Sequence, residues 1–383
     1  MSPTSKKEYF LSIRKRYHKS SGQEKSAILD EFCQNCGYNR KYAIRKLNKR
    51  LLRRLKKLGR PGPRPKYDSP ELKKCLQEIW IAANLPCSKR LKAILPVWIP
   101  FYQLEFGALK PDILKLLNKI SAASIDRHLK PIRSRYRGKG RSTTKPGLLL
   151  KSHIPIKTDQ WNEKEPGHIE TDTVAHCGGS SLGDYANTLD AVDILTGWNE
   201  QRAVWGKGQM AVLVQMKDIE DSLPFSMLGL DCDNGGELLN LQMYRYCMER
   251  KIPVQFTRSR AYHKNDNAHV EGKNWTHVRQ WLGYRRFDDP RIVDLLNDLY
   301  KTEWRLFQNF FLPSVKLQDK KRVGSKIVKV HDSPKTPYQR VLECKQIKSD
   351  VKERLQNQFK TLNPFKLRKT INEKIARIHR LAR

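Results

Sequence analysis

Three segments decide the predicted fold: GHIETDTVAHC (167–177), LDCDNGGE (230–237) and HKNDNAHVEGKNW (263–275). The first alternates like a β-strand and carries Asp172 near its centre. The second ends an apolar run at Asp233, where Asn-Gly forms a turn that directs the side chain out of the strand's carboxyl end. A carboxylate in a buried strand is costly unless it is paired or bound to metal. Both aspartates are therefore candidate site residues.

The third segment predicts a helix with a carboxylate on its core-facing side. At 100° per residue, Glu271 and Asn274 fall inside an apolar arc of roughly 140°. Lys273 lies outside this arc, which makes it an unsuitable partner for a buried ion pair with Glu271, although another partner remains possible. The arc is formed by Val270, Trp275, Val278, Trp281 and Leu282.

The region around these segments predicts an α/β domain. Of the 39 acidic residues, 21 lie between Glu165 and Glu303, whereas the rest of the chain is strongly basic. Three strand-like runs are followed by alternating helices and strands, in the order βββαβαβα. This order predicts a sheet of mixed parallel and antiparallel pairing.

Three acids at the ends of different elements fit divalent-metal phosphoryl transfer. Two Mg²⁺ or Mn²⁺ ions would use hard carboxylate oxygens and bind both the attacking and the leaving oxygen of a phosphodiester. Asp231 alternates with Asp233 on the same strand face and is an alternative ligand. Asp190 and Asp193 are interpreted as structural.

The set ETD, DNGGE and NDNAHVEGKNW resembles the DDE signature of integrase-core bacterial insertion-sequence transposases and retroviral-type integrases. The resemblance implies a ribonuclease H-like core with a mixed five-stranded sheet. It assigns catalysis and metal binding to Asp172, Asp233 and Glu271, and the 37 residues between the last two match the family's usual spacing. Asn234, Gly235 and Asn274 match as supporting residues. The zinc module of the retroviral members is not reproduced, because Cys33 and Cys36 lack paired histidines.

Charge predicts nucleic acid as the partner. The chain has 75 Lys and Arg against 39 Asp and Glu, a formal net charge of +36, which a polyanion would neutralise. Residues 1–58 predict a helix, a turn at Gly37 and a second helix, which is a helix-turn-helix candidate or a solvated basic helix. A second helical unit with a further candidate follows at 68–135. The proposed DNA contacts are Lys41, Arg45, Lys49, Arg60, Arg64, Arg127, Arg133, Arg135, Lys264 and Lys273.

We therefore predict a multidomain chain. Basic linkers at 59–67 and 136–163 separate the two helical domains and the catalytic core at 164–312. A small basic module with a helical tail, interpreted as DNA-binding or partner-binding, occupies 313–383. The first residues lack the apolar core of a signal peptide, and no membrane span is found, so a cytoplasmic, nucleoid-associated protein is expected.

The expected activity is that of a DNA transposase, which cuts the ends of a mobile element and joins them to target DNA. Its partners would be double-stranded DNA and, from the resemblance, a second copy or a higher oligomer. A catalytically inactive DNA-binding regulator and a metal-dependent nuclease without strand transfer are the alternatives.

Overall fold

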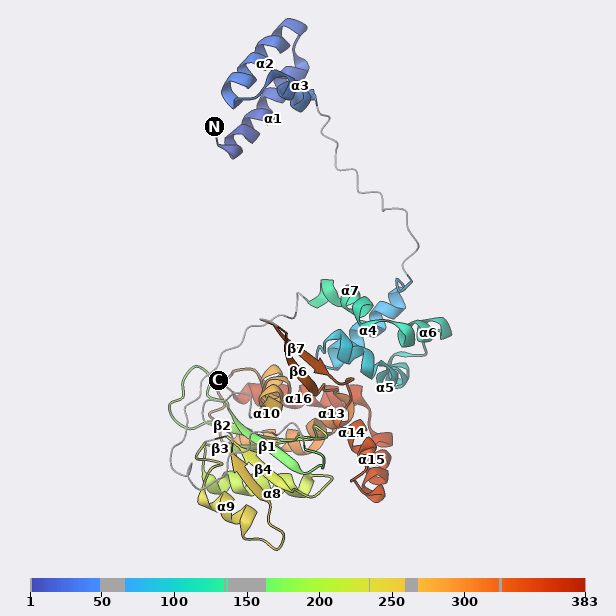
Figure 1. Cartoon of the computed structure of the whole chain (residues 1–383), viewed down its shortest axis with the longest axis vertical. Coiled ribbons are helices and arrows are strands. Elements are labelled where there is room, and N and C mark those ends of the chain that lie inside the picture. Colours follow the sequence, from blue (N-terminus) through green and yellow to red (C-terminus); the bar gives the residue numbers. More distant parts are fainter. Residues whose placement is uncertain are drawn as a thin grey trace. The chain divides into compact units, whose positions relative to one another are not determined.

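The computed structural model describes residues 2–48, 66–133, 136, 163–233, 235–258, 268–323 and 326–382 (Figure 1). Within these ranges the structure does not describe the side chains of a few residues, including Glu271. The chain divides into two compact units, Met1–Pro65 and Lys66–Arg383, each with its own hydrophobic core.

The first unit packs three helices around a small core that includes Phe32 and Leu47. The turn predicted at Gly37 is present, and this glycine adopts a left-handed φ of 68° at the end of the second helix. An additional helix precedes the two that the sequence pattern indicated. The three are α1 (Pro3–Lys19), α2 (Gly22–Cys36) and α3 (Arg40–Asn48).

The second unit contains the mixed five-stranded sheet, in the order β3-β2-β1-β4-β5. β1, β2 and β3 pair antiparallel, whereas β1, β4 and β5 pair parallel. The predicted order of strands and helices and the mixed pairing of the five-stranded sheet are thus confirmed. The strands are β1 (His168–Ala175), β2 (Ala186–Asp193), β3 (Asn199–Trp205), β4 (Gly229–Cys232) and β5 (Gln255–Arg258).

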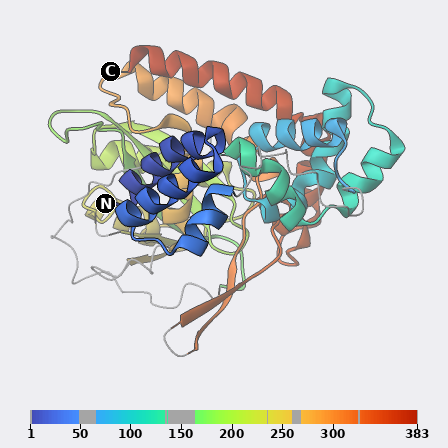
Figure 2. The same cartoon turned by 90° about the horizontal axis from the view of Figure 1, so that it is seen from above.

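Helices cover both faces of this sheet (Figure 1), and Figure 2 shows the same fold from above. On one face α8 (Gln209–Ser222) and α9 (Leu241–Met248) pack against Ile169 and the apolar residues of β4. Because side chains alternate along a strand, Asp172 and Val174 of β1 point to the opposite face. That face is covered by α10 (Ala268–Lys273), the π-helical turn η3 (Asn274–Arg279), α11 (Gln280–Leu282), α12 (Arg291–Leu299), the π-helical turn η4 (Tyr300–Trp304) and α13 (Arg305–Phe311).

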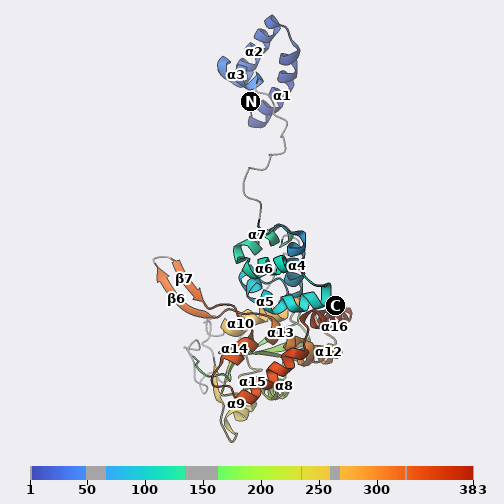
Figure 3. The same cartoon turned by 90° about the vertical axis from the view of Figure 1, so that its right-hand side faces the viewer.

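The predicted separation of residues 68–135 from the core differs from the structure. The helices of this segment share one hydrophobic core with α11 to α13 and with the C-terminal helices (Figure 3). The Trp98 indole Nε1 donates to the Phe311 carbonyl at 3.3 Å, and its ring packs edge-on against Phe307 and Phe365. The large aromatic faces of these elements bury one another, so they form one unit. The segment comprises α4 (Pro70–Ala82), α5 (Ser88–Phe106), α6 (Pro111–Lys119) and α7 (Ala122–Arg133).

The C-terminal segment also belongs to this unit. Its two-stranded hairpin contains the strand predicted in SKIVKVHD. The basic tail is helical as expected, and one side of it is buried through Ile371 and Ile378. The elements are β6 (Leu317–Val323), β7 (Lys326–His331), α14 (Pro337–Glu343), α15 (Ser349–Thr361) and α16 (Pro364–Leu381).

Asparagine side chains cover the outer edge of β3. The Asn309 amide of α13 donates to the Asn199 carbonyl and accepts from the Asn199 backbone N–H, both at 2.9 Å. Asn297 of α12 makes the same pair of bonds with Ala203, at 2.7 and 2.9 Å. A side-chain amide carries both a donor and an acceptor, so each asparagine takes the place of a residue on a neighbouring strand.

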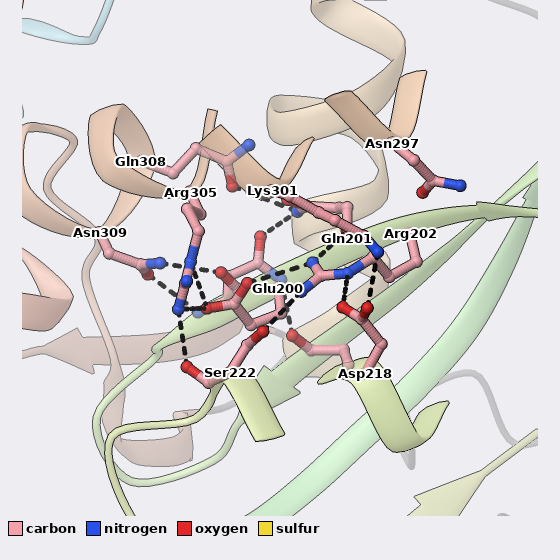
Figure 4. Close-up of polar contacts among 12 residues, drawn as sticks. Glu200, Gln201, Arg202, Asp218, Ser222, Asn297, Lys301, Arg305, Gln308 and Asn309 are labelled. Atoms are coloured by element: carbon pink, nitrogen blue, oxygen red, sulfur yellow. Dashed lines mark hydrogen bonds and ion pairs between the residues drawn. The ribbon is translucent and has the colours of Figure 1, made fainter. Parts of the chain in front are cut away.

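Charged side chains join the same strand to helices of both layers (Figure 4). Arg202 Nε donates to Asp218 Oδ1 of α8 at 2.6 Å, and Arg202 Nη2 donates to Ser222 Oγ at 2.7 Å. Glu200 accepts from Arg305 of α13 at 2.8 Å. The edge strand is therefore fixed against α8 and α13 at once.

We expect Asn309→Ala to lower the free energy of unfolding of the second unit by about 2–4 kcal/mol. The change leaves the buried backbone N–H and C=O of Asn199 without partners, and each such group costs about 1–3 kcal/mol. Urea unfolding followed by tryptophan fluorescence measures the difference. Asn357→Ala, an exposed asparagine of α15, is the control, and an equal effect of the two changes would contradict the assignment.

Candidate active site

Two predicted acids lie side by side on neighbouring parallel strands. Thr171 of β1 is the register partner of Cys232 of β4, so Asp172 and Asp233 each lie one residue further along. Parallel strands place equivalent residues at the same level of the sheet and on the same face. The two carboxylates therefore meet on the face that α10 covers.

Asp172 is partly buried and fixed by two hydrogen bonds. Its Oδ1 accepts from the Thr173 backbone N–H, and its Oδ2 accepts from Asn274 Nδ2, both at 2.7 Å. Burial, followed by the negative charge of Asp233, raises the pKa of Asp172 to about 7. The hydrogen bonds act in the opposite direction. A carboxyl group whose pKa lies near neutral pH is typical of functional sites.

Asp233 sits in a tight turn directly after β4. Its Oδ1 accepts from the Gly235 backbone N–H at 2.9 Å. A Cβ at position 235 would lie 2.9 Å from both Asp233 Oδ1 and the Glu237 carboxyl carbon, so a larger residue there would displace one of these carboxylates. Burial raises the pKa of Asp233, the charge of Glu237 raises it too, and Lys207 opposes them.

Glu237 is a neighbour of the site that the sequence analysis missed. Its Oε1 accepts from Thr173 Oγ1 at 2.9 Å and from Lys207 Nζ at 2.7 Å. This contact links the turn after β4 to β1 and to the segment between β3 and α8. The glutamate is part of the quoted DNGGE run, so its place in the turn was the available signal. The sequence gives no comparable indication for Lys207, because only the folded path of the chain brings this residue next to Glu237.

Glu170 and Asn274 hold α10 over β1. Glu170 Oε2 accepts from the Val270 backbone N–H in the first turn of α10 at 3.1 Å, and Asn274 follows α10 and reaches Asp172. A carboxylate at a helix N-terminus satisfies an N–H that has no partner within the helix. Glu271 belongs to α10 between these two anchors, and its side chain falls outside the description.

The predicted helical wheel is wrong beyond Lys273. Residues 274–279 form a π-helical turn, whose wider spacing breaks the 100° rotation per residue. Trp275, predicted to face the core, is 46% exposed, whereas Val278 and Leu282 are buried as expected. Lys273 is 9% exposed, and burial lowers its pKa to about 7. It does not occupy the exposed position expected of a surface phosphate contact.

The competing aspartates have other partners. Asp231 Oδ1 accepts from Thr257 Oγ1 of β5 at 2.5 Å within the sheet. Asp190 pairs in register with Asp172, and its Oδ1 accepts from Asn199 and Gln201. Asp193 accepts from the backbone of Gly167 and Thr196 and so fixes a turn. The described acids thus include one pair next to α10, Asp172 and Asp233. Among the described residues no group of three or more His, Cys, Asp or Glu side chains could hold a metal ion.

The remaining predicted contacts are distributed over both units. Lys41 and Arg45 are exposed on α3, and Arg127 is exposed on α7. Arg133 is engaged by Asp126 at 2.5 Å and by Ser88 at 2.7 Å. The others lie outside the described residues: Lys49, Arg60, Arg64, Arg135, Lys264 and the supporting Asn234. Within the described ranges no helix has the length and apolar character needed to cross a membrane.

The fold and the acid pair define a mixed-sheet α/β protein with two coupled aspartates beneath a helix. No protein-family model matches the chain. It is 35% identical over 345 residues to the "Uncharacterized protein y4rM" of Sinorhizobium fredii (strain NBRC 101917 / NGR234), over 89% of this chain and 96% of that protein. The chain therefore belongs to the same family as y4rM.

Solved structures similar to this chain include retroviral integrases. The catalytic core domain of BIV integrase matches 46% of this chain and 94% of its own, with 15% identity and a TM-score of 0.29. A simian T-cell lymphotropic virus intasome in complex with PP2A regulatory subunit B56 gamma matches 63% and 73%, with 14% identity and a TM-score of 0.33. The HTLV-2 integrase catalytic core with magnesium matches 39% and 90%, with 15% identity and a TM-score of 0.28. Likeness this low does not assign an activity to the chain.

We expect Asp172→Asn to stabilise the metal-free second unit at about pH 8 by roughly 1–3 kcal/mol. Because the folded pKa is raised to about 7, ionisation costs the native state free energy as pH rises from about 4 to 7. The gain should therefore shrink as pH falls through this window. Urea unfolding in EDTA measures it.

Asp294→Asn, an exposed acid of α12, is the matched control. A gain from Asp172→Asn that is equal at both ends of the pH window would show that the carboxyl is not titrating there.

Proposed function

We propose that the chain is a DDE-type DNA transposase. In the first step a water oxygen attacks the phosphorus at the end of the element, and the bond from phosphorus to the 3′ oxygen breaks, which leaves a 3′ hydroxyl. In the second step this hydroxyl attacks a target phosphodiester, and the target's own 3′ oxygen leaves. Neither step requires a covalent bond to the protein.

The proposal rests chiefly on the pair Asp172 and Asp233. Their register on β1 and β4 brings two carboxylates together where burial already disfavours charge, and the charge of Asp233 adds to the raised pKa of Asp172. α10 is anchored above them through Glu170 and Asn274. Residues 271 and 274 are three positions apart, a spacing that shares a helix face, which supports Glu271 as the third acid.

The donor set fits a divalent cation. Carboxylate oxygens are the ligands that Mg²⁺ prefers, and the raised pKa of both aspartates is the electrostatic cost that a bound cation removes. Bound Mg²⁺ would activate the attacking oxygen and stabilise the leaving oxygen. Asp172, Asp233 and Glu271 would hold the ions.

The neighbouring residues orient these acids. Asn274 and the Thr173 N–H fix the rotation of the Asp172 carboxylate, and each of its oxygens keeps a lone pair for a cation. The Gly235 N–H does the same for Asp233. The ion pair of Lys207 with Glu237 places a positive charge beside Asp233. These groups preorganise the site.

DNA is the proposed substrate. The net charge of +36 suits a polyphosphate partner, and Lys41 and Arg45 of α3 are exposed to contact it. Joining two element ends would require at least two copies of the chain.

Asp172→Asn, Asp233→Asn and Glu271→Gln should each lower DNA cleavage more than about 100-fold while DNA affinity is retained, because each removes a proposed metal ligand. The substrate is a plasmid that carries the sequences flanking the coding region, incubated with Mg²⁺ or Mn²⁺. Glu249→Gln, an exposed acid directly after α9, is the control. Cleavage close to wild type in any one variant removes that residue from the site.

The products separate the alternatives. Joined target DNA identifies a transposase, whereas nicked DNA without joined ends identifies a nuclease. Binding without any cleavage of the flanking sequences identifies a DNA-binding regulator.

Millimolar Mg²⁺ should raise the Tm of the wild-type second unit by roughly 2–4 °C at ten times its Kd, because it binds only the folded site. Asp172→Asn and Asp233→Asn should lose this shift, and EDTA should reverse it. Differential scanning calorimetry provides the measurement, with Glu249→Gln again as control. A shift that persists in both aspartate variants would place the ion elsewhere.

A further inference from the structure

A basic pocket of about 250 Å³ lies on the far side of α10 and η3 from the two aspartates. It is bounded by these elements, by the turn between β2 and β3, by the start of α5 and by the base of the β6–β7 hairpin. None of the described residues that line it is acidic. Its cationic and imidazole side chains are Arg90, Lys273, His277, Lys316, Lys329 and His331.

Hydrogen bonds fix the side chains of α10 and η3 that line the pocket. Lys273 Nζ lies 3.2 Å from His277 Nε2, and when Lys273 is protonated its ammonium donates to this imidazole nitrogen. The His277 proton then lies on Nδ1, which donates to Thr276 Oγ1 at 2.7 Å, and Thr276 donates to the Gly272 carbonyl at 2.9 Å. His277 is thus neutral. One N–H of Lys273 is used in this chain of bonds, and two remain.

The nearby acids offset only part of the positive charge on Lys273 and Lys316. Asp190 accepts from two side-chain amides, Asp193 accepts from a turn, and Asp332 accepts from the Lys316 backbone N–H and from Arg340. Lys316 Nζ donates to the Leu195 carbonyl. Within the described part of the chain, Arg90 and Lys329 make no ion pair. Grouped cations without a counter-charge are costly, and a bound anion would remove that cost.

The pocket adjoins the candidate active site through a single helix. Asn274 contacts Asp172, whereas Gly272, Lys273 and Thr276 line the pocket. On the outer side the β6–β7 hairpin projects from the body of the unit (Figure 3). Its sequence LQDKKRVGSKIVKVH (317–331) carries five lysines and arginines against one aspartate. The hairpin sequence therefore has a net positive charge.

We propose that this pocket binds one backbone phosphate of DNA that is engaged at the adjacent aspartates. The guanidinium of Arg90 offers paired N–H donors that match two phosphate oxygens, and the lysines add point charges. The net positive charge of the hairpin sequence favours a phosphate within a polymer over a free anion. The inference takes DNA as the substrate and so rests on the proposed function.

Equilibrium binding of a short non-specific duplex, measured by fluorescence anisotropy over a range of KCl concentrations without divalent metal, tests the pocket. Arg90→Gln and Lys329→Gln should each reduce the slope of log affinity against log salt by about one, because each removes one phosphate contact. Both side chains lie at accessible positions, so the variants should fold. Arg245→Gln, an exposed arginine of α9 outside the pocket, removes the same charge and should leave the slope unchanged.

A thermal shift with inorganic phosphate separates the two sources of phosphate. A phosphate-induced rise in Tm that Arg90→Gln abolishes, together with unchanged DNA slopes, would identify a free-anion site and overturn the proposal. Unchanged slopes without such a rise, or an equal loss of slope in Arg245→Gln, would also overturn it. The wild-type protein could fail to cleave DNA while Arg90→Gln and Lys329→Gln still reduce the slope. That result would refute the transposase function and leave the proposed phosphate site standing.

Discussion

The parallel pairing of β1 with β4 is the constraint on which the candidate site depends. It places Asp172 and Asp233 at one level of the sheet, where their charges oppose each other and burial disfavours both. Hydrogen bonds from Asn274, Thr173 and Gly235 offset part of this cost. The site is therefore assembled against an electrostatic penalty, which is expected where a protein keeps like charges together for a ligand.

The surrounding elements stabilise the position of the two aspartates in two ways. Glu170 anchors α10, and the edge contacts of β3 anchor α12 and α13, so the helices above the aspartates are tied to the sheet at several points. The shared aromatic core of α5, α13 and α16 then fixes those helices from behind. The N-terminal part of the second unit thus supports the sheet domain as well as carrying basic residues of its own.

The sequence predicted the sheet well because alternation and turn residues are local signals. The strand around Asp172 and the turn after Asp233 required no knowledge of distant contacts. Prediction failed where distant packing decides. Lys273 is buried beside the base of the β6–β7 hairpin, the π-helical turn leaves Trp275 exposed, and aromatic side chains join segments predicted as separate domains into one core. The sequence motif contains Glu237. Its hydrogen bond with Lys207, however, joins two segments that are distant in the sequence, and no local pattern predicts that they meet. Glu271 stays a prediction drawn from its place in α10.

The asparagines along β3 also restrict how copies of this chain can assemble. Many proteins associate by adding a strand of one subunit to the sheet edge of another. At Asn199 and Ala203 the backbone groups that such a strand would need are already bonded to Asn309 and Asn297. A continuous sheet across two copies cannot form at that edge without breaking these bonds. Assembly on DNA would then have to use helical surfaces, the β5 edge or the nucleic acid itself.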